Sequence, residues 1–163
     1  MGIQKCGTVN NRGEERGAGG AMESCLKRSP AHPVEVAAGL IFREGRLLIA
    51  QRYPGAHLGG LWEFPGGKRE PEETLPQALE RELLEELGIK AVVAERIDTV
   101  EHRYSSKAVR IEFFRCTIAE GEPRALGCHA VKWVDRAQLA AHQFPDADAR
   151  LLGRLQLDSF SWT

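Results

Sequence analysis

The sequence predicts a mixed α+β domain, in which β-strands precede and follow one amphipathic helix and short helices end the chain. Apolar runs of strand length occur on both sides of residues 75–87. Residues 75–87 instead carry a leucine at every fourth position, which places the leucines along one face of a helix. The stretch from residue 135 onward carries helix-capping and proline signals. Strands, one helix, further strands and terminal helices in this order are typical of the α+β class.

Length and composition exclude several classes of protein. The 163 residues suffice for one domain with its own core and are few for two. The net charge of -1 does not indicate a polyanion binder, so we expect no direct nucleic-acid partner. The longest apolar run, residues 36–42, is too short to span a membrane, and no hydrophobic signal core is present. The four cysteines lack CxxC spacing, so we expect reduced thiols in a cytoplasmic protein with no membrane partner.

The first 31 residues differ from the rest of the chain. Glycine, asparagine and charged residues dominate residues 1–31, and no apolar period appears there. We therefore expect residues 1–31 to form a flexible tail and residues 32–163 to form the domain.

The first half of the domain predicts a hairpin and a short third strand. Gly45 suits the turn of the hairpin, and Pro65 stops the third strand. The expected strands are residues 34–42, 47–52 and 61–64.

The boundaries of the central helix follow from its end signals. Thr74 and Gln77 have the spacing of a capping box, and Pro76 is tolerated only in a first turn. Gly88 is a C-cap signal. The helix is therefore expected over residues 75–87.

The second half of the domain predicts three more strands and two helices. Asp135 has the position of an N-cap for a short helix, and a last helix is expected after Pro145. The expected strands are residues 96–104, 108–118 and 130–134.

Residues 66–89 concentrate seven glutamates in 24 residues. Glu82, Glu85 and Glu86 share one sector of the helix, and part of that sector faces the leucine stripe. Like charges at these spacings repel, and their partial burial is costly unless the charge is compensated. One interpretation is a solvated acidic face. The other is a site for Mg²⁺ or Mn²⁺, because clustered carboxylate oxygens suit these cations.

Gly66, Gly67 and Arg81 lie beside the acidic sector and bear on the choice between these two interpretations. Gly66 and Gly67 allow the backbone to approach another group closely, with carbonyl oxygens free to face a metal. Arg81 either pairs with a neighbouring carboxylate and holds the cluster in place, or is a surface arginine.

This stretch resembles the Nudix box at each fixed position of that motif. The flanking segment GGLWEFPGGK and the later FPDAD are similar to the MutT-like branch of the family, and the resemblance covers residues 34–157. The matching positions are Gly67, Glu73, Arg81-Glu82-Leu83, Glu85-Glu86 and Gly88-Ile89.

The resemblance implies a fold, an activity and a cofactor. The fold would be an α/β/α sandwich around a mixed sheet, with the box as a loop, a helix and a loop. The activity would be Mg²⁺-dependent hydrolysis, with Mn²⁺ as a substitute, of a nucleoside diphosphate linked to another group. For MutT-like members the substrate is an oxidised nucleoside triphosphate such as 8-oxo-dGTP, and the products are the monophosphate and pyrophosphate.

The resemblance also assigns roles in the box. It makes Glu82, Glu85, Glu86 and the Gly66 carbonyl the metal ligands. We assign catalysis to Glu82, Glu85 and Arg81, with Glu82 as the base that positions or deprotonates water. Glu73 is expected to anchor the loop.

Four residues outside the box are candidate substrate contacts by the same resemblance. Arg52 matches an arginine that faces phosphate, or is a surface strand residue. His57 is a weaker candidate in the following loop. Phe144 either stacks on the base or closes the core. Asp148 either reads the base or caps the last helix.

Two departures from the family pattern bear on the substrate. No acid stands just before His129, where MutT has a further carboxylate ligand. Asp148 replaces a base-reading asparagine, and an ionised aspartate only accepts hydrogen bonds. Oxidised guanine and cytosine nucleotides are therefore both expected substrates.

Other activities stay open from the sequence. A dinucleoside polyphosphate or a nucleotide sugar is an alternative substrate. A non-catalytic nucleotide-binding module is a further alternative, which predicts lost box carboxylates, and none is lost here. The sequence leaves the oligomeric state open.

Overall fold

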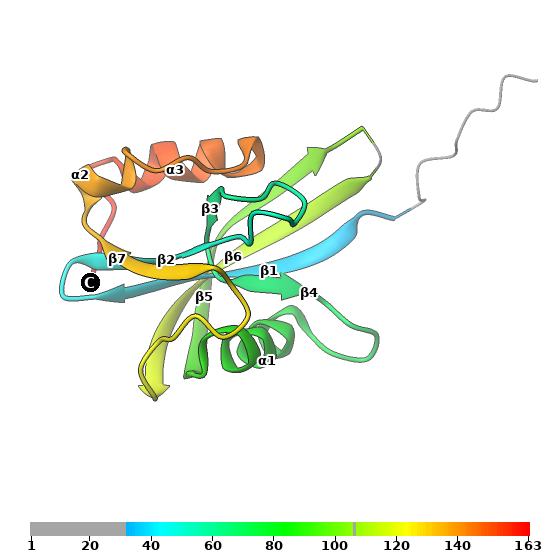
Figure 1. The fold of residues 1–163 in the computed structure, drawn as a ribbon, viewed down its shortest axis with the longest axis horizontal. Coiled ribbons are helices and arrows are strands. Elements are labelled where there is room, and N and C mark those ends of the chain that lie inside the picture. The colour runs from blue at the N-terminus through cyan, green and yellow to red at the C-terminus, as the bar shows by residue number, and fades with distance from the viewer. Residues whose placement is uncertain (1–31, 106) are drawn as a thin grey trace, which may run out of the picture.

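The computed structural model describes residues 32–105 and 107–163, which form a mixed β-sheet between two helical layers (Figure 1). The long helix α1 (Leu75–Leu87) covers one face of the sheet, and α2 (Arg136–Leu139) and α3 (Ala149–Leu155) lie over the other. A short 3₁₀ turn, η1 (Asp146–Asp148), leads into α3. This arrangement confirms the predicted α+β class and the α/β/α sandwich. The predicted tail, residues 1–31, lies outside the described residues.

The sheet has seven strands, and its centre is a parallel pair. The hydrogen-bonded order is β3-β2-β1-β6-β5, with β4 also pairing with β1 and β7 with β2. β1 runs parallel to β6, whereas the other pairs are antiparallel. The strands are β1 (Val34–Arg43), β2 (Arg46–Gln51), β3 (Trp62–Glu63), β4 (Gly66–Lys68), β5 (Lys90–Arg103), β6 (Ala108–Glu120) and β7 (Ala130–Val134).

The alternation of side chains along β1 divides the interior into two cores. Ala37 and Ile41 face the layer of α1, whereas Ala38 and Leu40 face the layer of α3. The predicted leucine stripe packs into the first core, where its last three members, Leu79, Leu83 and Leu87, are fully buried. Burial of each such leucine contributes roughly 1.5–3 kcal/mol, so α1 is held mainly by this face.

The end signals of α1 act as predicted. The Thr74 side chain accepts a hydrogen bond from the backbone N–H of Gln77, and the Gln77 side chain accepts one from Thr74. Gly88 ends the helix in the left-handed conformation, with φ of 68°. Asp135 and Gln138 make the same reciprocal cap at the start of α2, as the sequence predicted for Asp135.

Two strands differ from the sequence-based expectations. β5 begins at Lys90, six residues before the predicted start at 96, because its pairing with β6 continues past two register shifts that disrupt the side-chain alternation. β4 was expected as a loop, yet Gly66 and Gly67 pair with Ala38 and Ala37 of β1. Long-range pairing overrides the low strand propensity of glycine at β4.

Both glycines of β4 are required by close approach. A Cβ atom on Gly66, whose φ is 149°, would lie 2.1 Å from the carbonyl oxygen of Ala37. A Cβ atom on Gly67 would lie 2.2 Å from the carboxyl carbon of Glu82. β4 is therefore placed tightly between β1 and α1.

No helix in residues 32–105 and 107–163 is long and apolar enough to cross a membrane. Of the four cysteines, the two in the described part of the chain, Cys116 and Cys128, are free thiols, as predicted.

Gly66→Ala should lower the free energy of unfolding by more than about 2 kcal/mol, because the new methyl group overlaps a backbone oxygen that cannot move freely. Gly153→Ala is a matched control inside α3, where an added Cβ has nothing within 4 Å. The control should raise stability by about 0.5–1 kcal/mol. Urea unfolding of both variants would test this, and equal stabilities would contradict the packing of β4.

Candidate active site

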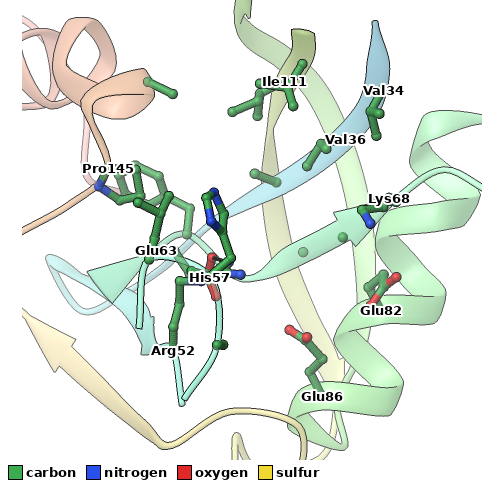
Figure 2. Close-up of a pocket in the computed structure, with 18 of the residues that line it drawn as sticks. Val34, Val36, Arg52, His57, Glu63, Lys68, Glu82, Glu86, Ile111 and Pro145 are labelled. Carbon is green, nitrogen blue, oxygen red and sulfur yellow. Dashed lines mark hydrogen bonds and ion pairs between the residues drawn. The ribbon is translucent and has the colours of Figure 1, made fainter. Parts of the chain in front are cut away.

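A cleft of about 670 Å³ lies beside the sheet and joins α1 to η1. Figure 2 shows Glu82 and Glu86 projecting from α1 into this cleft, opposite Arg52, Glu63 and His57. The apolar floor comes from the central strands β1 and β6, including Val36 and Ile111 (Figure 2). The cleft therefore has an acidic end at α1, an apolar middle and a second acidic end at η1.

The predicted acidic sector of α1 divides between cleft and solvent. Glu82 and Glu86 line the cleft, and the Glu82 side chain is only 17% exposed. Glu85 is 60% exposed and does not line the cleft. A purely solvated face therefore does not describe this helix.

Arg81 connects the box loop to the helix. Its guanidinium contacts Glu73 at 2.7 Å and Glu82 at 3.0 Å, and it donates to the carbonyl oxygen of Lys68 at 3.1 Å. A longer contact of 3.5 Å reaches Glu85. Arg81 itself does not line the cleft, so it holds carboxylates in place, and the surface-arginine interpretation is wrong.

Glu73 lies where the resemblance placed an anchor of the loop. Its carboxylate accepts hydrogen bonds from Arg81 and from the backbone N–H of Glu70, the latter at 2.7 Å. These bonds hold the pKa of Glu73 below its ordinary value and raise that of Arg81. The residues before α1 are therefore tied to the helix by charge-assisted hydrogen bonds.

Glu86 is costly to ionise in the protein without metal. Burial, and then the neighbouring carboxylates of Glu63 and Glu82, together raise its pKa to about 8. A positive charge bound in the cleft would offset this cost and favour the ionised form of Glu86.

The donor set fits a hard divalent cation. Glu82, Glu86 and Gly66 all line the cleft, and carboxylate and carbonyl oxygens are the ligands such ions prefer. Among the described residues, no three His, Cys, Asp or Glu side chains already stand in an arrangement that could hold an ion. Water and substrate phosphate oxygens would therefore supply part of the coordination shell.

Glu63 is a cleft carboxylate that the sequence analysis did not single out. It lies on β3 and contacts the guanidinium of Arg52 at 2.5 Å. Burial raises its pKa although Arg52 opposes this shift. The sequence signal that could have identified Glu63 is that it is the one acidic residue in the otherwise apolar segment 61–64.

Arg52 and His57 both line the cleft. Arg52 also donates from Nε to the carbonyl oxygen of His57 at 2.7 Å, which ties the β2–β3 loop to the end of β2. The His57 ring lies 5.8 Å from that of Tyr104 in an edge-on arrangement. Arg52 thus lines the cleft, and its contact with phosphate stays a prediction.

Of the two candidate base contacts, Asp148 lies in the cleft and Phe144 packs against the core. Asp148 lines the cleft with 5% exposure, and its side chain does not cap α3 or hydrogen-bond any described residue. Burial, and then the charge of Glu63, raise its pKa to about 7. Phe144 does not line the cleft. Its ring packs 5.2 Å from that of Phe64 in the core, so its expected role in base stacking is replaced by a packing role.

Three further cleft residues were missed by the sequence analysis. Tyr104 and Lys107 come from the turn between β5 and β6, and no residue pattern marks that turn. Cys128 lies where the expected acid before His129 is absent. Burial raises the pKa of the Cys128 thiol to about 11, so this side chain is neutral in the cleft.

A profile of the NUDIX domain family matches residues 37–154. The chain belongs to this family. Of its relatives, the 8-oxo-dGTP diphosphatase of Haemophilus influenzae is 40% identical over 75% of this chain and 90% of its own length. The CTP pyrophosphohydrolase of Escherichia coli is 37% identical over 73% of this chain and 88% of its own length. The predicted Nudix resemblance and enzyme class are thereby confirmed.

A solved structure of a relative supports the same Nudix fold. The solution structure of the E. coli ORF135 protein superposes with a TM-score of 0.64 and 36% identity, over 74% of this chain and 86% of the other. Nudix hydrolases act on small nucleotide substrates and generally need a divalent metal.

The stability of the metal-free Nudix domain should fall as pH rises from about 4.5 to about 8. Glu86 titrates near 4.5 in the unfolded chain and near 8 in the folded protein. Between these values the folded state binds more protons, so each pH unit removes at most about 1.4 kcal/mol through this group. Glu86→Gln should flatten the slope in urea unfolding with EDTA. The Glu80→Gln control, exposed on the same helix, should keep the wild-type slope. A wild-type slope in Glu86→Gln would contradict the assigned burial of Glu86.

Proposed function

We propose that this Nudix hydrolase is a Mg²⁺-dependent nucleoside triphosphate pyrophosphohydrolase whose main substrate is 8-oxo-dGTP. One observation carries the proposal. A single continuous cleft has the carboxylates of the Nudix helix at one end and the buried Asp148 at the other. This layout suits a phosphate chain at α1 and a base at η1, with the sugar over the apolar floor.

The chemistry at the phosphate end would split the anhydride between the α- and β-phosphates. Bound Mg²⁺ would neutralise phosphate charge and acidify a bound water. Glu82 would orient that water and accept its proton, while Arg81 fixes the carboxylate through its bond of 3.0 Å. Arg52 would contact the phosphate chain, exchanging its ion pair with Glu63 for the substrate.

The base end would recognise a base through Asp148. A neutral carboxyl group both donates and accepts, as an amide does, and therefore suits an edge that presents a carbonyl and an N–H group, as in 8-oxoguanine. The ionised group only accepts and suits an edge of N–H donors alone. The raised pKa of about 7 makes both forms accessible near neutral pH.

The second candidate function is hydrolysis of CTP or dCTP. The ionised form of Asp148 is compatible with it, because the amino group of cytosine is a donor. The relative named CTP pyrophosphohydrolase supports it at 37% identity. A non-catalytic module receives no support, because every box carboxylate is present. We also propose that the enzyme acts in the cytoplasm, where free thiols such as Cys116 and Cys128 persist.

The wild-type enzyme with Mg²⁺ should convert 8-oxo-dGTP to the monophosphate and pyrophosphate. Glu82→Gln should lower kcat by roughly 10²–10⁴-fold, because the variant cannot accept the proton of water. Glu80→Gln should keep wild-type kcat. Product chromatography over 8-oxo-dGTP, dGTP, CTP, dCTP, a diadenosine polyphosphate and ADP-ribose would measure this. Cleavage of the dinucleotide or ADP-ribose alone would contradict the proposed substrate class, and tight binding without turnover would favour the non-catalytic module.

If Asp148 reads the edge of 8-oxoguanine that presents a carbonyl and an N–H group, the ratio of kcat/KM for 8-oxo-dGTP to that for CTP should fall by roughly tenfold as pH rises through about 7. The ionised carboxylate would then face that carbonyl oxygen, and one mispaired polar group costs about 1–3 kcal/mol. Asp148→Asn should abolish this pH dependence, since an amide does not titrate. Groups at the phosphate end that titrate over this range change kcat/KM for both substrates by the same factor, so their effect does not appear in the ratio. A wild-type ratio that is constant between pH 6 and pH 8 would contradict base recognition by Asp148.

A further inference from the structure

Asp98 is a buried charge on β5 that the proposed chemistry does not use. Its side chain is 3% exposed. Asp98 pairs with Phe113 across the sheet, and Phe113 belongs to the core on the α3 face. Asp98 therefore projects toward α3, away from α1 on the opposite face of the sheet.

Two arginines from α3 converge on this carboxylate. Arg150 donates to Oδ1, and Arg154 forms an ion pair with Oδ2 at 3.0 Å. Arg154 also donates to the carbonyl oxygen of Ile97 at 2.9 Å, and the backbone N–H of Thr99 donates to Oδ1 at 2.8 Å. These bonds favour the charged form and hold the pKa of Asp98 below its ordinary value, although burial opposes this.

A β-bulge accounts for the direction of these groups. The register of β5 on β6 shifts between Arg96, paired with Phe114, and Asp98, paired with Phe113. Ile97 is the extra residue between these two pairs. A bulge re-aims side chains and backbone groups, and here the Asp98 carboxylate and the Ile97 carbonyl both reach α3.

The arginines that bind Asp98 follow directly after the cleft residue Asp148. Arg150 is two residues beyond Asp148 and Arg154 one further turn along the same helix. Asp148 makes no side-chain hydrogen bond to any described residue, so its place in the cleft depends on the backbone of η1 and α3. That backbone is attached to the sheet by the contacts with Asp98 and by the apolar residues Leu151 and Leu155.

We propose that Asp98 is a positioning residue for substrate selection: by holding Arg150 and Arg154 it fixes the start of α3, and thereby sets the position of Asp148 in the cleft. The inference rests on the proposed function, in which Asp148 reads the base. Asp98 does not line the cleft. A shift of about 1 Å at a recognition group is enough to cost large factors in a reaction.

Asp98→Asn tests the inference, because it keeps the shape and removes the charge. The KM for 8-oxo-dGTP should rise roughly tenfold while kcat changes less than about twofold, since Glu82 and Glu86 lie on α1. Glu95→Gln is the matched control, because Glu95 is also on β5, pairs with Arg115 at 2.9 Å and is 60% exposed. The control should leave KM unchanged. Should Asp98→Asn fail to fold, Arg150→Gln alters the same contact from the exposed side and should raise KM in the same direction.

A double variant separates positioning from general stability. If Asp98 acts through Asp148, then Asp98→Asn should have little further effect on KM in an Asp148→Asn background. A lowered melting temperature with unchanged KM, or equal effects of Asp98→Asn in both backgrounds, would overturn the inference. Failure of the proposed function is recognised separately, because Asp148→Asn would then leave the selectivity between 8-oxo-dGTP and CTP unchanged at every pH.

Discussion

The placement of the Glu82 carboxylate against the backbone of Gly67 is the constraint on which the rest of the site depends. A side chain at residue 67 would overlap that carboxylate. β4 therefore fits between β1 and α1 only with glycine at residue 67. The short distance between β4 and α1 brings the box loop and the helix together. Arg81 pairs with Glu73 and Glu82 at the same time. It thereby connects the box loop to α1 and offsets part of the negative charge of the helix.

The cleft contains buried carboxyl groups that are costly to ionise in the metal-free protein. Glu63, Glu86 and Asp148 all have raised pKa values, and burial is the first cause of each. Arg52 forms an ion pair with Glu63 and opposes the rise in the pKa of both Glu63 and Glu86. In the metal-free protein this cost keeps Glu86 mostly protonated near neutral pH, and a divalent cation with a phosphate chain would favour its ionised form at the end formed by α1. The same low polarity at η1 leaves Asp148 able to change its protonation state near neutral pH.

The sequence predicted the parts of the structure that local signals determine. The bounds of α1, its capping box and its buried leucines follow from spacing alone, and the acidic sector of Glu82 and Glu86 could be located in the same way. β4, Glu63 and the turn residues Tyr104 and Lys107 could not be predicted, because pairing between distant strands places them in the cleft. Phe144 shows the converse limit, since a motif match does not determine whether a ring faces a ligand or the core.

Calorimetric titration of the metal-free enzyme with Mn²⁺ at pH 7, without nucleotide, tests the central claim most directly. Repetition in buffers of different ionisation enthalpy reports the protons released, because metal ligands must be deprotonated. With the pKa of Glu86 near 8, metal binding should release close to one proton from wild type and from Glu80→Gln. Glu86→Gln should bind more weakly and release almost none. Equal affinity and equal proton release in Glu86→Gln and wild type would contradict the account of the acidic helix as a metal site in which Glu86 loses its proton when metal binds.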